Sequence, residues 1–339
     1  MSDRATSGIA DILADLLERR ELSAEQIERV FGDMLAGDFH EGEAAAFLIA
    51  LRMKGETAGE LAAGAALLRR HMVRFDTGRD DLLDTCGTGG DDAGTFNIST
   101  AAALVAAGAG VPVVKHGNRA VSSRSGSADV LAELGVNVDA GPTWARRCLE
   151  RAGLAFCFAP HFHPALTHVG PLRRRLGVRT ILNLLGPLAN PAGAAYQLLG
   201  VGRAELLDPM ARALARLGVR QAFVVCARDG LDEVSLCAAT EFRRVRQGEI
   251  TAGEWTTRDF GLPACSPADL KAADPEASAG IIRRILANEE LPATNVVIAN
   301  AGAAVLAAEH ASDLRDATAI ATKALRSGRA AQVLTALQD

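Results

Sequence analysis

The sequence has few aromatic side chains and no excess of positive charge. Phe, Trp and Tyr together make up 4% of its 339 residues, and its formal net charge is −5. Nucleic-acid-binding domains carry a basic patch or stripe, which this charge balance does not favour. No uncharged apolar segment is long enough to span a bilayer. We therefore expect neither a nucleic-acid nor a membrane partner, and an anionic substrate would need positive charge concentrated locally.

The six cysteines, at positions 86, 148, 157, 226, 237 and 265, form no C-x-x-C pair. Their spacing argues against a zinc site and against a dithiol redox motif. It is typical of small buried residues in a reducing compartment. The first twenty residues are charged from Asp3 onward and have no continuous apolar core, unlike a signal peptide. We expect a soluble cytoplasmic protein.

Residues 7 to about 72 show only helical patterns. Ser23 with Gln26, and Thr57 with Glu60, have the spacing of capping boxes at the starts of helices. Short connections between such amphipathic helices predict a small helical bundle.

Short apolar runs alternate with helical segments from about residue 73 onward. The runs are DLLDTC (81–86), VPVVKHG (111–117), LAFCFA (154–159), YQLLGV (196–201) and QAFVVCA (221–227). Helical patterns lie between them, and the chain turns helical again after residue 280. This alternation predicts a mostly parallel sheet with helices on both faces. The predicted fold class is therefore α/β, with a helical domain at 1–73 and a large α/β domain at 74–339. The segment 161–190, rich in Arg, His and Pro, is predicted to cross between the two domains.

The stretch DTCGTGGDDAGTFNIST, residues 84–100, follows the first apolar run. Its glycines permit positive φ and let backbone N–H groups approach a ligand closely. Asn97, Ser99 and Thr100 open an alanine-rich helix, and a helix N-terminus is a favourable place for phosphate. The alternative is a tight turn followed by an ordinary helix cap.

The stretch KHGNRAVSSRSGS, residues 115–127, follows the second run. Lys115, His116, Arg119 and Arg124 bring cationic groups to the end of a strand, and four serines bring hydroxyls. Ligands of open α/β sheets bind at the carboxyl ends of strands, where both stretches are expected to lie. The alternative is a solvated basic loop.

Two further groups bear charge. Arg173, Arg174, Arg175 and Arg179 lie in the crossover segment, and most surface arginines have no special role. Asp232 and Glu233 follow an apolar run, where adjacent carboxylates can hold Mg²⁺ or simply lie in a solvated loop. Taken together, the phosphate-cradling turns, cations and acidic pair predict a site for a metal-bound sugar phosphate.

Five stretches occur together and in order: GTGGD, TFNIST, KHGNRAVSSRSGS, LGVRTILNLLGPLANP and the Asp232-Glu233 pair. In this combination the sequence resembles the anthranilate phosphoribosyltransferases from about residue 8 to its end. The resemblance implies a nucleoside phosphorylase/phosphoribosyltransferase-like fold, in which part of 165–190 joins the helical domain. It implies homodimers that associate through the helical domains. It also implies transfer of the phosphoribosyl group from phosphoribosyl pyrophosphate (PRPP) to the amine of anthranilate, the second step of tryptophan biosynthesis from chorismate.

The family's site residues carry over to the matching positions. Those implied to bind PRPP are Gly87, Gly90, Asp91, Thr95, Asn97, Ile98, Ser99, Thr100, Lys115, His116, Gly117, Asn118, Arg119, Ala120, Val121, Ser122, Ser123 and Ser127. Those implied to hold Mg²⁺, with two ions per subunit, are Ser99, Asp232 and Glu233. Those implied to bind anthranilate are Gly87, Asn118 and Arg173. The sequence departs modestly from the family at Asp92 and Gly94, and Asp92 stands where many members carry glycine.

The reaction requires no side chain that transfers a proton. An aromatic amine is neutral at pH 7 and attacks with its own lone pair, so we expect positioning and electrostatics to do most of the catalysis. Two alternatives stay open at this point. A pyrimidine nucleoside phosphorylase shares the architecture and uses inorganic phosphate, and a non-enzymatic relative would bind nucleic acid.

Overall fold

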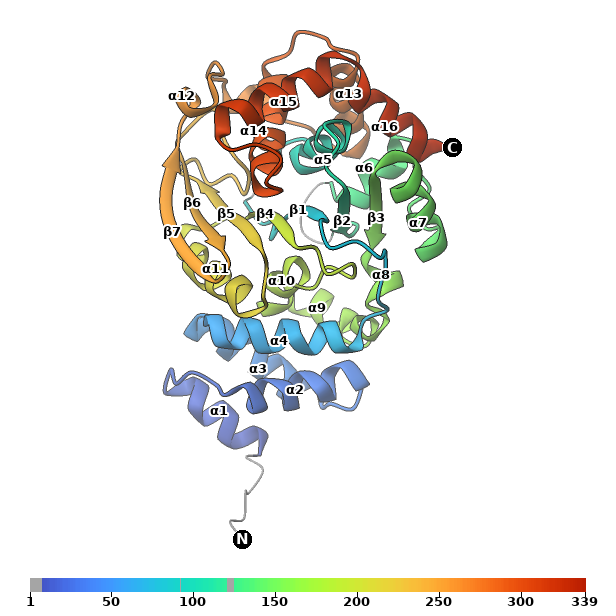
Figure 1. Ribbon diagram of the computed structural model, residues 1–339. Coiled ribbons are helices and arrows are strands. Elements are labelled where there is room, and N and C mark those ends of the chain that lie inside the picture. The colour runs from blue at the N-terminus through green and yellow to red at the C-terminus, as the bar shows by residue number, and fades with distance from the viewer. Residues whose placement is uncertain (1–7, 92, 121–124) are drawn as a thin grey trace.

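The computed structural model describes residues 8–91, 93–120 and 125–339. Figure 1 shows a layer of helices at the N-terminal end and, above it, a twisted sheet with helices on both of its faces. Val121, Ser122, Ser123 and Arg124 of the basic loop, and Asp92, lie outside the described residues.

The described residues of the N-terminal layer form four helices. These helices are α1 (Ile9–Leu17), α2 (Ala24–Ala36), α3 (Glu41–Lys54) and α4 (Ala58–His71). Ser23 Oγ accepts a hydrogen bond from the backbone N–H of Gln26 at 3.2 Å, and Thr57 Oγ1 accepts one from Glu60 at 3.3 Å. Both predicted capping boxes are confirmed, with the reciprocal bonds from the backbone N–H groups of Ser23 and Thr57 also present.

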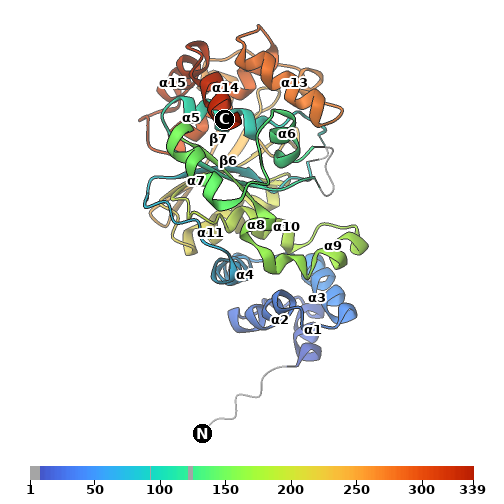
Figure 2. The same cartoon turned by 90° about the vertical axis from the view of Figure 1, so that its right-hand side faces the viewer.

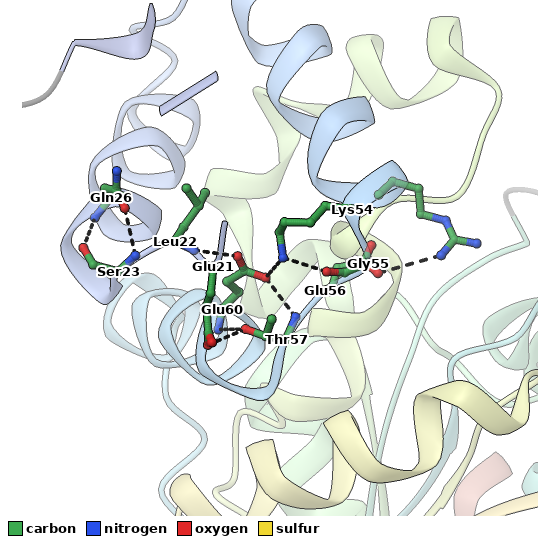
Figure 3. Close-up of polar contacts among 10 residues, drawn as sticks. Glu21, Leu22, Ser23, Gln26, Lys54, Gly55, Glu56, Thr57 and Glu60 are labelled. Carbon is green, nitrogen blue, oxygen red and sulfur yellow. Dashed lines mark hydrogen bonds and ion pairs between the residues drawn. The ribbon is translucent and has the colours of Figure 1, made fainter. Parts of the chain in front are cut away.

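A buried ion pair ties the helices of this layer together (Figure 3). Lys54 Nζ lies 2.9 Å from a carboxylate oxygen of Glu60, and both side chains are almost fully buried. The Glu60 carboxylate also accepts hydrogen bonds from the backbone N–H groups of Leu22 and Thr57, at 2.9 and 2.8 Å. Because its partners fill the oxygen lone pairs, the charge is well accommodated in the interior. The contacts fix the end of α3 and the start of α4 against the α1–α2 connection.

In the described residues the strands form one seven-stranded sheet of order β3-β2-β1-β4-β5-β6-β7. They are β1 (Leu83–Gly87), β2 (Val113–Gly117), β3 (Leu154–Phe158), β4 (Tyr196–Gly200), β5 (Gln221–Ala227), β6 (Thr240–Arg246) and β7 (Glu249–Trp255). Strands β1 to β5 pair in parallel, and β5, β6 and β7 pair antiparallel. The predicted mostly parallel sheet is confirmed.

The β6–β7 hairpin was not predicted from the sequence. Its two-residue turn, Gln247-Gly248, has positive φ at both positions (49° and 86°), as the favoured hairpin turn requires. Strands β6 and β7 carry many charged residues and are only partly buried, so they contain no apolar run. The Gln-Gly turn was the available signal.

Strands β1 to β5 are buried on both faces of the sheet, which explains their apolar sequences. Leu198 and Val225 point into one core, and their neighbours Leu199 and Val224 point into the other. Helices contributing to the first core are α5 (Ile98–Gly108), α6 (Ser127–Glu133), α7 (Gly141–Ala152), α13 (Pro275–Leu286), α14 (Pro292–Ala307), α15 (Leu314–Arg326) and α16 (Arg329–Gln338). Helices contributing to the second core are the four N-terminal ones with α9 (Gly170–Leu176), α10 (Ile181–Leu185) and α11 (Leu207–Arg216). Short elements complete the chain: α8 (Ala159–Phe162), α12 (Thr257–Phe260), and the 3₁₀ turns η1 (Pro164–Thr167), η2 (Gly186–Leu188), η3 (Ala204–Leu206) and η4 (Pro267–Leu270).

The crossover segment packs against the N-terminal layer, as both views show (Figures 1 and 2). Helix α9 contacts α3, and α10 contacts α4. Gly64 of α4 has no side chain where Leu185 of α10 docks, and a Cβ there would lie 3.1 Å from the leucine methyl carbons. The division of the chain at residue 73 stays a prediction. Among the described residues no helix is long and apolar enough to cross a membrane.

Candidate active site

The stretches singled out in the sequence meet at one edge of the sheet. The glycine-rich loop follows β1 and the basic loop follows β2, while Gly200 ends β4 and Asp232 lies beyond the end of β5. Gly87 and Gly200 face each other in the register of β1 and β4. Since these strands are adjacent and parallel, their carboxyl ends lie side by side.

Asp232 is fitted against the glycine-rich loop. Its Oδ2 accepts a hydrogen bond from the backbone N–H of Gly89 at 2.7 Å. A Cβ on Gly87 would lie 2.5 Å from the same oxygen, and a Cβ on Gly200 would overlap the Asp232 backbone carbonyl. Gly87 and Gly200 are thus required by close approach, whereas Gly89 and Gly90 have left-handed backbone conformations, with φ of 65° and 77°.

The acidic pair lies in a setting that disfavours its negative charge. Burial raises the pKa of Asp232 to about 7, with the charge of Asp91 as a second cause. Burial and then the charge of Asp232 raise the pKa of Glu233 to about 8, and Lys115 opposes this shift. Both residues nevertheless keep part of their surface exposed. A divalent cation would relieve this repulsion.

The donor set fits Mg²⁺. Within the described residues, no three His, Cys, Asp or Glu side chains are grouped to hold a metal alone. Mg²⁺ is usually bound by one or two carboxylates together with waters and substrate phosphates, so a carboxylate pair beside a phosphate site is sufficient.

Lys115 and the start of α5 contact each other beside the glycine-rich loop and the basic loop. Lys115 is buried, and its Nζ donates to Ser99 Oγ at 3.1 Å and to the carbonyl of Thr85. Burial lowers its pKa, while the charge of Asp84 acts in the opposite direction. Asn97 Oδ1 caps α5 by accepting from the backbone N–H of Thr100 at 3.1 Å. The helix start therefore combines a cap, a hydroxyl and a buried cation, which suits a phosphate or a metal-bound phosphate.

Other members of the predicted PRPP set have defined local roles. Asp91 Oδ1 accepts from the N–H of Ala93 at 3.1 Å, and Thr95 forms a backbone bridge with Lys271. Ile98 is buried in the core, so only its backbone is available to a ligand.

The described part of the basic loop is tied to α6 and to a nearby aspartate. The guanidinium of Arg119 pairs with Asp129 at 3.3 Å and with Asp139 at 3.1 Å, and the backbone N–H of Ala120 donates to Asp129 at 2.8 Å. Gly117 lies where a side chain would collide with Ser127 Oγ. Asn118 Oδ1 accepts from the backbone N–H of Arg119 at 2.8 Å. Arg119 is therefore engaged within the protein.

A buried polar layer beneath the site was missed in the sequence. Asp84 is fully buried and accepts from Asn190 Nδ2 at 2.8 Å and from the backbone N–H of His116 at 3.2 Å. Its burial raises its pKa to about 6. His116 Nδ1 bonds the carbonyl of Gly186 at 3.1 Å, and burial and then the neighbouring His163 lower the pKa of His116 to about 3. The available signal was an acid inside an apolar strand, in DLLDTC.

The four arginines of the crossover separate into two kinds. Arg174 and Arg175 are exposed, and Arg175 pairs with Glu41 at 2.6 Å. Arg173 is half-buried, and burial followed by the charge of Arg179 lowers its pKa. Among the described residues the Arg173 guanidinium has no hydrogen-bond or ion-pair partner. Arg179, not among the residues predicted to form the site, donates from Nη2 to the carbonyl of Thr88 in the glycine-rich loop.

Comparison with known proteins shows which family has this architecture. The family described as "Glycosyl transferase family, a/b domain" matches residues 79–331, and "Glycosyl transferase family, helical bundle domain" matches residues 10–72. An anthranilate phosphoribosyltransferase of Anaeromyxobacter dehalogenans (strain 2CP-C) is 47% identical over 329 residues, covering 97% of each chain. The chain belongs to the anthranilate phosphoribosyltransferase family. The resemblance seen in the sequence is thereby confirmed, and the two alternatives, a phosphorylase and a nucleic-acid-binding relative, are not supported.

Solved structures of anthranilate phosphoribosyltransferases extend the comparison. The enzyme of Thermus thermophilus has a TM-score of 0.89 and 42% identity, over 97% of this chain and all of the other. The Saccharomyces cerevisiae enzyme in complex with PRPP and Mg has a TM-score of 0.87 and 26% identity, over 98% of this chain and 97% of the other. The same yeast enzyme in complex with 4-fluoroanthranilate has a TM-score of 0.83 and 25% identity, over 98% of each chain.

Proposed function

We propose that this protein transfers the phosphoribosyl group of PRPP to the amine of anthranilate, giving N-(5-phosphoribosyl)anthranilate and pyrophosphate in tryptophan biosynthesis. One observation carries the proposal. The glycine-rich loop, the start of α5, Lys115 and the Asp232-Glu233 pair meet at one sheet edge. The yeast relative, whose structure contains PRPP and Mg, supports the choice of substrate and cation.

The proposed PRPP site is built mainly from backbone N–H groups and small polar side chains. The glycine-rich loop and the start of α5 supply N–H groups and a positive dipole end to the pyrophosphate. Asp232, Glu233 and Ser99 would hold Mg²⁺, with two ions per subunit. When bound, the cation stabilises the negative charge that develops on the leaving pyrophosphate. The residues of 115–120, with Val121, Ser122, Ser123 and Ser127, complete the site.

The proposed anthranilate site lies near Gly87, Asn118 and Arg173. The half-buried guanidinium of Arg173 has no ion-pair partner among the described residues, so it is available for a carboxylate. A planar, bidentate arginine–carboxylate pair would orient the neighbouring amine.

The chemistry requires positioning more than proton transfer. The nitrogen–C1 bond forms as the C1–oxygen bond to pyrophosphate breaks, and the ribose passes through an oxocarbenium-like state. The amine is neutral at pH 7 and attacks with its lone pair, so the nitrogen becomes positively charged as the bond forms and then releases a proton to water. The main contribution of the protein is therefore to hold PRPP and anthranilate close together in the orientation for reaction.

We also propose that the protein is a cytoplasmic homodimer that associates through the helical layer. Leu17 of α1 and Met53 of α3 are 79% and 74% exposed. They border an apolar groove of about 450 Å³ between α1 and α3. Large exposed side chains around an apolar groove are typical of an interaction surface. The six cysteines are free, which suits a reducing compartment.

The decisive experiment follows the fluorescence of anthranilate. Purified protein should consume anthranilate only when PRPP and Mg²⁺ are both present. Phosphorolysis of pyrimidine nucleosides by inorganic phosphate, without need of Mg²⁺, is the competing outcome. Folded protein that leaves anthranilate untouched over a wide range of Mg²⁺ would overturn the proposal.

A further inference from the structure

Arg179 connects the crossover segment to the glycine-rich loop. It lies between α9 and α10, is half-buried, and donates from Nη2 to the carbonyl of Thr88, 91 residues earlier in the chain. Its guanidinium also lies directly against the backbone of Gly90, where a Cβ would overlap it. The φ of 77° at Gly90 favours glycine, and any side chain there would displace the Arg179 guanidinium.

Open space borders the glycine-rich loop near Arg179. A cavity of about 100 Å³ lies against Thr88, Gly89 and Gly90 and is also lined by Arg52, Asn183 and Arg203. On the other side, Asp232 accepts from the N–H of Gly89, and Thr88 N donates to the carbonyl of Gly200 at 2.8 Å. Without the Arg179 guanidinium, the loop would have open space into which to shift.

We propose that Arg179 is a positioning residue for the phosphate-binding loop, holding Thr88 to Asp91 in the conformation that presents their backbone N–H groups to PRPP. The inference rests on the proposed function. It adds a residue from the crossover segment to the PRPP site and links the conformation of the glycine-rich loop to that segment.

The first test replaces Arg179 by methionine, which keeps length and removes the donors and the charge. A hydrogen bond made by a charged group contributes about 1.5–3 kcal/mol, which corresponds to roughly ten- to a hundredfold in binding. We expect the KM for PRPP to rise by roughly that factor, with the KM for anthranilate at saturating PRPP changing about twofold or less. Arg179→Lys should recover part of the loss, because lysine can reach Thr88 but cannot cover Gly90 with a planar group. The matched control is Arg174→Met, an exposed neighbour on α9.

The second test uses the contact with Gly90. Gly90→Ala should displace the guanidinium and weaken PRPP binding. Combining it with Arg179→Ala should then weaken binding no further than Gly90→Ala alone, because both changes remove the same contact.

Failure of the Arg179 proposal can be distinguished from failure of the proposed function. A wild-type protein that does not consume anthranilate defeats the function itself. If the wild type is active, an unchanged KM for PRPP in Arg179→Met overturns this inference. So does a lowered melting temperature that weakens both substrates equally, and so does a double variant whose defect is the product of the two single ones.

Discussion

The carboxylate of Asp232 accepts a 2.7 Å hydrogen bond from the backbone N–H of Gly89, across 143 residues of sequence. The loop proposed to bind phosphate and the loop proposed to bind metal therefore share one contact. A displacement of either loop should be felt in the binding of both PRPP and Mg²⁺.

Removing the charge of the acidic pair should impair catalysis severely. Asp232→Asn with Glu233→Gln keeps the shape and the acceptor for Gly89 while removing the attraction for Mg²⁺. We expect activity to fall at least about a hundredfold, because metal stabilisation of a leaving group amounts to several kcal/mol. Raising the Mg²⁺ concentration should restore part of it. Steady-state rates over a series of Mg²⁺ concentrations provide the measurement. If the variant shows the wild-type dependence on Mg²⁺, the pair binds no metal and is simply part of a solvated loop.

A side chain at Gly87 should push Asp232 out of place. The added Cβ of Gly87→Ala would lie 2.5 Å from Asp232 Oδ2. Overpacking costs about 1–3 kcal/mol, so we expect kcat/KM to fall roughly five- to a hundredfold with the Mg²⁺ requirement raised. Gly280→Ala in α13, where a Cβ meets open space, is the control and should behave as wild type. Wild-type kinetics for Gly87→Ala would show that Asp232 yields easily.

Truncating Arg173 should separate the two substrates. Losing a charged hydrogen-bond partner costs about 1.5–3 kcal/mol, so Arg173→Ala should raise the KM for anthranilate roughly ten- to a hundredfold. The KM for PRPP should change much less. Arg174→Ala on the exposed side of α9 is the control. If Arg173→Ala weakens both substrates alike together with thermal stability, the residue only braces the crossover.

His116 should make the fold sensitive to acid. The pKa of His116 is about 3 in the folded protein and about 6.5 in the unfolded chain. Below pH 6.5 the imidazole is therefore protonated in the unfolded chain but stays neutral in the folded protein. The contribution of His116 to stability should therefore be fully present above pH 6.5 and be lost as the pH drops toward 3, by up to about 1.4 kcal/mol per pH unit. The raised pKa values of Asp84, Asp232 and Glu233 act in the opposite direction, so the test is the difference between variant and wild type. His116→Asn, which can still donate to Gly186, should become more stable relative to wild type as the pH falls from 7 to 5. Urea unfolding at pH 7 and pH 5 measures this, and exposed His310→Asn should retain the wild-type slope.

The helical layer offers a test of assembly. Leu17→Glu with Met53→Glu places charge on the groove between α1 and α3 without touching the sheet edge. We expect sedimentation to show a dimer for wild type and a monomer for this variant. A wild-type monomer, or a variant that remains dimeric, would contradict the proposed interface.

Much of the fold was predictable because local signals and packing agree. The capping boxes at Ser23 and Thr57, and the apolar runs around Leu198 and Val224, each specify their elements on their own. The hairpin was missed because its strands face partly toward solvent, where apolar patterning is weak and only the turn at Gln247-Gly248 carries information.

The site was predictable only in part. The motifs identified the loops, and the topology brings them to one edge. No local pattern shows that Gly87 must be small because Asp232 approaches it, or that Arg179 reaches back to Thr88. These contacts join residues that are far apart in the sequence, so no pattern of residue spacing reveals them.

The second core has a consequence for how the protein unfolds. It runs without a break from Phe31 in the helical layer, through Leu185 of the crossover, to Val224 of the sheet, and α4 packs on both α10 and α11. Elements that share one core melt cooperatively. Heating should therefore give a single calorimetric transition, and a fragment beginning at residue 74 would expose the apolar surface that α4 now covers and aggregate.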